Sequence, residues 1–145
     1  MSTVFGFSRE HLDKPYLIGY NSCVVMILTR EFVILPEFDK QWKSMNLTDN
    51  ELLRLEENIL ENPKIGDVIR GTGKLRKMRF AFNNKGKSGS ARVIYVDFAA
   101  YEKVYLIVAY PKSEKDNLSK EECNKMKLVI DTLEKTLKEI SYGRI

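Results

Sequence analysis

The chain has 145 residues, 43% of them hydrophobic and 30% charged, and a formal net charge of +4 at pH 7. These values are typical of one soluble domain with its own core. No apolar run approaches the ~20 residues of a membrane-spanning helix, and the N-terminus lacks the pattern of a secretory signal. We therefore expect a cytoplasmic protein that does not contact a membrane.

Cysteine and histidine usage limits the chemistry. The two cysteines, Cys23 and Cys123, have neither metal-ligand spacing nor the pattern of a disulfide framework, so we expect reduced thiols. The one histidine, His11, lies close to the N-terminus. The rest of the chain offers no histidine for acid–base catalysis or zinc binding, and we expect no metal and no cofactor.

The N-terminal segment, residues 1–25, shows no sustained periodicity and is interrupted by Pro15 and Gly19. We interpret it as a leader that is poorly ordered or not native to the protein, with a short added strand or helix as the alternative. A regular pattern begins at Met26, so the expected domain spans residues 26–145.

A strand and a helix are expected next. Residues 29–35 are rich in β-branched and aromatic side chains, which favours a strand. Pro36 suits the first turn of a helix, and Phe38, Trp42 and Met45 follow with the spacing of one apolar stripe. We therefore expect Trp42 in the core rather than on a binding surface.

The second helix has recognisable ends. Thr48 and Glu51 form a capping box at its start. Asn62 and Pro63 end it, because the residue before a proline disfavours helical geometry. We expect the two helices to form an antiparallel hairpin that packs on a sheet.

Three antiparallel strands are expected at residues 74–82, 91–99 and 103–110, with a glycine loop at 86–90. The second and third strands are apolar on both faces, which indicates central strands that are covered above and below. These strands form a meander that follows the helical hairpin.

The last helix begins at a second capping box, formed by Ser119 and Glu122. Its apolar residues form a narrow seam that packs either on the sheet or on a partner helix. The residues of the seam are Met126, Ile130, Leu133, Leu137 and Ile140. The whole order of elements predicts an α+β fold.

Positive charge is concentrated in residues 70–92, because no acidic residue occurs from Val68 to Val96. A field of one sign repels itself unless it meets a polyanion, and the obvious polyanion is a nucleic-acid backbone. Alternation along the first meander strand places Lys77 and Arg79 together on one face. The alternative is a solvated basic surface with no ligand.

Lysine and arginine side chains can cleave RNA without histidine or metal. Attack by the 2′-OH needs a base, neutralisation of the phosphorane charge and an acid for the 5′-oxygen. The residues that supply such a site, if they converge, are Lys77, Arg79, Arg92, Tyr110 and Lys112. The cations that we expect to grip RNA are Arg70, Lys74, Arg76, Lys85 and Lys87.

Each candidate catalytic residue also has a purely structural interpretation. Lys77 and Arg79 are then exposed charges, Tyr110 is a core aromatic, and Arg92 and Lys112 belong to ion pairs of little energetic value. The acidic partners for those pairs are Asp67, Asp97 and Glu114.

Three blocks, GDVIRGTGKLRKMRF, GKSGSARVIYV and VYLIVAYPKSEKDNLS, resemble the HigB-like branch of the RelE/ParE toxin superfamily, over about residues 29–140. The resemblance implies a RelE-like fold, a small antiparallel β-sheet with an N-terminal helical hairpin and a C-terminal helix. It also implies a toxin of a type II toxin–antitoxin system, an mRNA interferase. Such a ribosome-dependent endoribonuclease cuts mRNA in the ribosomal A site and inhibits translation.

Carried over by position, the family's K-x-R pair corresponds to Lys77 and Arg79, and the arginine of its R-x-x-Y strand corresponds to Arg92. The basic residue after the last strand corresponds to Lys112.

The resemblance also implies a tyrosine near the C-terminus that contributes to cleavage. The only tyrosine beyond Lys112 is Tyr142, after the last helix, so we assign Tyr110 in its place. The general base is Lys77 or Lys112, and the sequence leaves this choice open.

The implied partners are a cognate antitoxin, typically with a helix-turn-helix, together with the ribosome and mRNA. Operator DNA is expected to bind only through the toxin–antitoxin complex. Two alternatives remain: a nucleic-acid-binding module without chemistry, and a ParE-type toxin that poisons gyrase.

Overall fold

A computed structural model describes residues 16–18, 26–28, 30–84 and 87–143. The strands of its main sheet are β3 (Glu31–Ile34), β4 (Asp67–Val68), β5 (Arg76–Asn84), β6 (Lys87–Phe98) and β7 (Lys103–Pro111). Its helices are α2 (Pro36–Ser44), α3 (Asp49–Glu61) and α4 (Lys120–Ser141), with a 3-10 turn, η1 (Ala99–Tyr101), between β6 and β7. None of the described helices is long and apolar enough to cross a bilayer.

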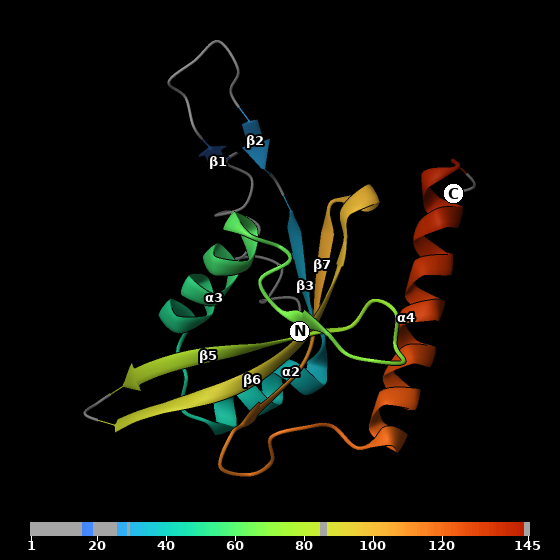
Figure 1. Ribbon diagram of the computed structural model, residues 1–145. Helices are drawn as coiled ribbons and strands as arrows, with labels where there is room; N and C mark the ends of the chain where they lie inside the picture. The colour runs from blue at the N-terminus through green and yellow to red at the C-terminus, as the bar shows by residue number, and fades with distance from the viewer. Residues whose placement is uncertain (1–15, 19–25, 29, 85–86, 144–145) are drawn as a thin grey trace.

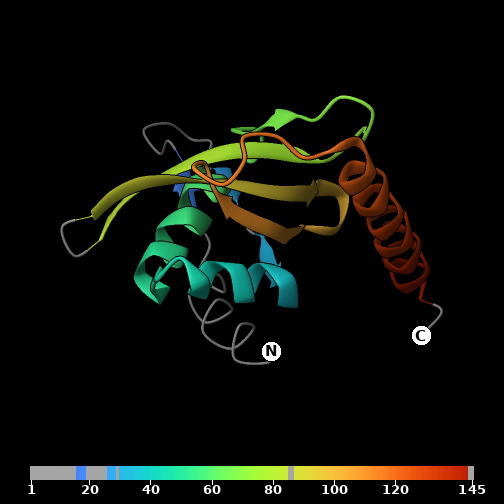
Figure 2. The ribbon, with the colours of Figure 1, turned by 90° about the horizontal axis from the view of Figure 1, so that it is seen from below.

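The main sheet has the strand order β3-β7-β6-β5-β4 (Figure 1). β5, β6 and β7 form the predicted antiparallel meander, and β3 pairs with β7 in parallel. Helices α2 and α3 cover one face of the sheet, and α4 lies beside the sheet, apart from them (Figure 2). The buried residues of α4 pack against side chains of the other face. The predicted α+β class is confirmed.

Part of the predicted leader is described. β1 (Tyr16–Ile18) and β2 (Met26–Leu28) pair antiparallel in a separate two-stranded sheet. The other positions of residues 1–25 lie outside the described residues. The division into a leader and a domain that begins at Met26 therefore stays a prediction.

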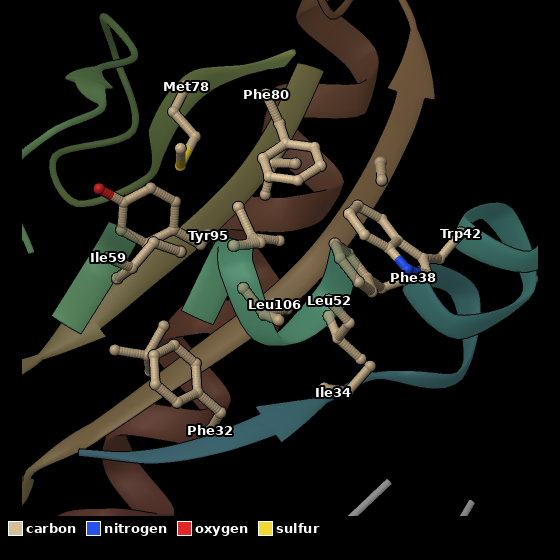
Figure 3. Packing of buried hydrophobic residues seen from close by; sticks show 14 of the residues in the cluster. Phe32, Ile34, Phe38, Trp42, Leu52, Ile59, Met78, Phe80, Tyr95 and Leu106 are labelled. Carbon is tan, nitrogen blue, oxygen red and sulfur yellow. The ribbon is translucent and has the colours of Figure 1, made fainter. Parts of the chain in front are cut away.

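The larger core lies between the sheet and the helices α2 and α3. Its aromatic centre is formed by Phe38, Trp42 and Phe80, which point toward one another in Figure 3. Trp42 is 3% exposed and stacks on Phe38 with a ring-centroid distance of 5.3 Å. The prediction that Trp42 is a core residue is confirmed.

The second core lies under α4. Ile130 and Leu137 are its buried helical residues, and Met126 and Leu133 are partly buried against it. Ile140 is 51% exposed. The predicted apolar seam therefore packs on the sheet of its own chain, except at Ile140.

The pairing of β6 with β7 contains a β-bulge. Ile94 lies opposite Val108, and Tyr95 lies opposite Leu106, so Ile107 has no partner on β6. An extra residue in one strand reverses the face to which every later side chain points.

The effect of the bulge is visible in the two cores. Leu106 belongs to the core under α2 and α3, whereas Val108 and Tyr110 belong to the core under α4. Tyr110 thus lies on the same face as its register partner Arg92.

The predicted glycine loop at 86–90 is wrong from residue 87 onward. β6 begins at Lys87, and Gly89 pairs with Phe82 of β5. A Cβ atom on Gly89 would lie only 3.0 Å from Cζ of Phe82. The glycine therefore makes room for an aromatic ring across the strand pair, where we had expected a turn.

Tyr95 ties the segment between α3 and β5 to the sheet. Its hydroxyl donates to the carbonyl of Pro63 at 2.7 Å and accepts from the N–H of Gly66 at 3.0 Å. Tyr95→Phe leaves both backbone groups without this partner, and we expect the free energy of unfolding to fall by about 1–3 kcal/mol. Urea denaturation measures the change.

Tyr101→Phe is the matched control, because the Tyr101 hydroxyl makes no hydrogen bond to the described part of the chain. An equal loss of stability in both variants would contradict this role of Tyr95.

Candidate functional site

Three of the predicted catalytic residues form a row across the meander. The strand register places Arg79 of β5 opposite Arg92 of β6, and Arg92 opposite Tyr110 of β7. Residues directly opposite one another in antiparallel strands share a face. Lys77 precedes Arg79 by two positions and therefore points to the same face. The structure thus brings together Lys77, Arg79, Arg92 and Tyr110.

The loop between β7 and α4 closes over this row through Asp116 and Asn117. Asp116 Oδ1 accepts from Arg92 Nε at 3.1 Å and from Arg92 Nη2 at 2.9 Å. Lys77 Nζ donates to Asn117 Oδ1 and to the carbonyl of Asp116, the latter at 3.3 Å. The Tyr110 hydroxyl donates to the same carbonyl at 3.5 Å. Two neighbouring loop residues therefore contact three of the predicted side chains.

Arg92 is the most enclosed cation of the row. Its side chain is 12% exposed, whereas that of Asp116 is 59% exposed. Both donors converge on one carboxylate oxygen, and Nη1 is buried without a hydrogen bond to any described residue. The alternative partner Asp97 pairs with Arg30 at 2.8 Å. Asp116 thus neutralises Arg92 through a single carboxylate oxygen and leaves one buried guanidinium donor without a partner among the described residues.

Arg79 is exposed and has no hydrogen bond or ion pair within the described ranges. It lies directly opposite Arg92, and like charges at opposite positions of a strand pair destabilise the sheet. A bound anion between the two guanidinium groups removes this repulsion. The arginine pair is thus suited to phosphate.

Tyr110 is a proton donor at neutral pH. Burial raises the pKa of its phenol to about 12, although the neighbouring charge of Arg92 acts in the opposite direction. The residue is 3% exposed, and the ammonium of Lys115 lies 5.0 Å from the ring centroid. Tyr110 is both a core aromatic and a member of the row, so its two sequence interpretations are compatible.

Lys112 lies apart from the row. Its side chain is exposed and lines a groove of about 480 Å³, while its N–H donates to the carbonyl of Ser90 at 3.1 Å. The ion pair with Glu114 that we considered does not occur among the described contacts. The structure therefore gives no reason to place Lys112 beside Lys77.

Two of the predicted RNA-gripping residues have internal partners. Lys74 pairs with Glu134 of α4. Arg76 Nη1 donates to the carbonyl of Gly66 at 2.6 Å, and its register partner is Tyr95. Arg76 therefore lies on the face opposite Lys77.

The other gripping residues are dispersed. Arg70 is exposed, Lys87 is the first residue of β6, and Lys85 lies outside the described residues, as do His11 and Cys23. Within the ranges that the structure describes, no group of three or more His, Cys, Asp and Glu residues is arranged to hold a metal ion.

Sequence reasoning missed Asp116, Asn117 and Lys115. Their only local signal is a polar segment that leads into the capping box at Ser119. Such a segment predicts a loop, but it does not predict that the loop folds back onto β6.

Comparison with known proteins gives two findings. Residues 34–141 match the family model described as the RelE toxin of the RelE/RelB toxin–antitoxin system. The chain is also similar to a solved structure of an E. coli RelE toxin mutant in the free state, with 17% identity and a TM-score of 0.42. That alignment covers 59% of this chain and 85% of the other. The family match includes the whole row of site residues.

Because the pKa of Tyr110 is raised in the folded state, the free energy of unfolding depends on pH in the alkaline range. The folded state holds the phenol proton more tightly than the unfolded chain, in which the pKa of the phenol is 10.0. The stability that Tyr110 contributes is fully present below pH 10.0 and is lost as the pH rises to about 12. We expect Tyr110→Phe to lose less stability than the wild type over this interval.

Urea unfolding at a series of alkaline pH values measures this difference. Burial also raises the pKa of Tyr95 and Tyr105, and both residues remain in the variant and in the wild type. Identical pH profiles for the two proteins would contradict the assignment to Tyr110.

Proposed function

This chain belongs to the RelE toxin family, and from that premise we propose that it is a ribosome-dependent mRNA endoribonuclease. The membership makes it a toxin of a toxin–antitoxin system, with an antitoxin as partner. The observation that carries the proposal is the row of Arg79, Arg92 and Tyr110 on one sheet face, with Lys77 beside it. The row combines phosphate-binding cations with a proton donor.

In the proposed reaction the two arginines hold the scissile phosphate. The guanidinium groups of Arg79 and Arg92 face it from adjacent strands and neutralise the charge that develops on the phosphorane. An entering phosphate replaces Asp116 as the partner of Arg92. Because Arg92 is nearly enclosed by protein, this contact is stronger than one in open solvent.

Proton transfer completes the proposed reaction. The 2′-oxygen loses its proton to a base and bonds to phosphorus, the bond to the 5′-oxygen breaks, and that oxygen gains a proton. The products are a 2′,3′-cyclic phosphate and a 5′-hydroxyl. Tyr110 is protonated at neutral pH and supplies the acid. We assign the base to Lys77, since Lys77 and Tyr110 contact the same carbonyl of Asp116, whereas Lys112 has no described side-chain contact with the row.

The proposed partners and the proposed compartment follow from mRNA as the substrate. Translating ribosomes and mRNA are the partners, the cytoplasm is the compartment, and operator DNA binds only through the complex with a helix-turn-helix antitoxin. The HigB-like branch remains our proposal within the family, based on the sequence blocks that carry the site.

Primer extension on a reporter mRNA tests the activity. We expect the wild type to cut only in the presence of translating ribosomes, and Lys77→Ala with Arg92→Ala to abolish the cuts and relieve growth arrest. Lys120→Ala with Lys135→Ala is the control, because it removes two exposed charges from α4. Circular dichroism confirms that each variant is folded.

Three outcomes would contradict the proposal. Cuts by the folded Lys77/Arg92 double variant would refute the site. Cuts without ribosomes would indicate a free ribonuclease. Intact mRNA together with a DNA-damage response would indicate a gyrase poison.

Because Asp116 pairs with Arg92, we predict that removing the Asp116 carboxylate raises the affinity for RNA. Asp116→Asn removes a carboxylate that competes with phosphate. Because that carboxylate is 59% exposed, although Arg92 is not, we take the contribution of a surface ion pair, about 0.2–1 kcal/mol. We therefore expect RNA to bind roughly 1.5- to 5-fold more tightly, as measured by fluorescence anisotropy. Glu114→Gln is the matched control, since Glu114 has no ion pair among the described residues. Weaker binding by Asp116→Asn would show instead that Asp116 positions Arg92.

A further inference from the structure

We propose that the groove beside the row is a subsite for one RNA nucleotide, with its base stacked on Phe82 and its phosphate bound by Lys112. The inference rests on the proposed function, because it names how that site holds the nucleotide next to the scissile phosphate. The groove has a volume of about 480 Å³ and is lined by Phe82, Gly89, Ser90, Pro111, Lys112 and Ser113.

The groove arises because the strands of the meander end at different places. β7 ends at Pro111, whereas the hairpin of β5 and β6 continues beyond it (Figure 1). The bond from the N–H of Lys112 to the carbonyl of Ser90 is the last described backbone contact on that side of β6. Beyond Ser90 the edge of β6 has no β7 partner, and the groove opens there.

Phe82 supplies the stacking surface. Its ring is half-buried, packs at the margin of the larger core and has its tip against Gly89. Because Gly89 has no side chain, nothing at that position covers the ring from the neighbouring strand. An aromatic ring that is rigidly held yet reachable from solvent is the usual platform for the base of a single-stranded nucleic acid.

Charge around the groove favours an anion. Lys112 is exposed and has no ion pair within the described ranges. Neither β5 nor the part of β6 that lines the groove contains an acidic residue. The two hydroxyl groups of Ser90 and Ser113 add hydrogen-bonding capacity beside the apolar ring. The combination suits a nucleotide better than a purely apolar ligand.

The groove is also close enough to the row to hold an adjoining nucleotide. Ser90 precedes Arg92 by two positions on β6, which corresponds to about 7 Å along a strand. Pro111 directly follows Tyr110 on β7. Phe82 and Arg92 point to opposite faces of the sheet, and the free edge of β6 provides the path between them.

Binding of two oligomers of equal length tests the subsite. One is a fluorescent oligouridine, and the other has abasic riboses on the same backbone. We expect the wild type to bind the oligouridine roughly 5- to 160-fold more tightly. Phe82→Leu, which keeps apolar bulk without a ring, should bind both oligomers equally, while Phe82→Trp should retain the preference.

Two further variants separate stacking from charge. Lys112→Met should weaken binding of both oligomers alike and lower the slope of log affinity against log salt by about 1. Tyr142→Leu removes an aromatic ring that is 68% exposed near the C-terminal end of α4, and it should change nothing. Thermal unfolding of each variant checks that Phe82→Leu has not lost its fold.

The outcomes distinguish the subsite from the proposed function. A folded Phe82→Leu that still prefers the oligouridine overturns the subsite, even where ribosomal cleavage persists. Failure of the wild type to bind the oligouridine at low salt also overturns it. A preference that depends on Phe82, without cleavage on ribosomes, supports the subsite and refutes the nuclease.

Discussion

The site depends on one extra residue in β7. Ile107 has no partner on β6, and this bulge turns Tyr110 toward the face of Arg92. With strict alternation from Leu106, Tyr110 would point toward α2 and α3, and the row across the meander would contain only arginines. A β-bulge is a common way to redirect a side chain beside a functional site. The acid of the proposed reaction is therefore placed by strand register.

The rest of the structure offsets the electrostatic repulsion between Arg79 and Arg92. Two arginines at opposite positions of a strand pair cost stability, yet β6 is held by apolar residues on both faces, such as Val93 on one and Ile94 on the other. Asp116 offsets part of the charge from outside the sheet. Its loop leads into the capping box at Ser119, so the start of α4 positions the carboxylate. Stability thus comes from the two cores, and it offsets the repulsion within the charged row on the face of β6 that also carries Ile94.

Local signals explain what the sequence predicted well. The capping box of Thr48 and Glu51 and the stripe through Trp42 depend on residues within two turns of helix, and both were confirmed. The bulge at Ile107 had no such signal, because β7 is apolar on both faces and hides its own periodicity. The glycine loop was misjudged since Gly89 is explained by a ring on another strand. Contacts that join distant segments were the ones that a single sequence could not reveal.

The same reasoning divides the roles within the row. The burial that places Tyr110 in the core also raises its pKa to about 12, so the phenol donates a proton at neutral pH and does not accept one. Arginine is always charged and cannot serve as base. Of the predicted residues that converge, only Lys77 is left for that role, in the form of its neutral amine, and its Nζ contacts Asn117 and Asp116 of the closing loop. In the proposed reaction the loop must therefore release Lys77 as well as Arg92, which makes the β7–α4 loop part of the catalytic cycle.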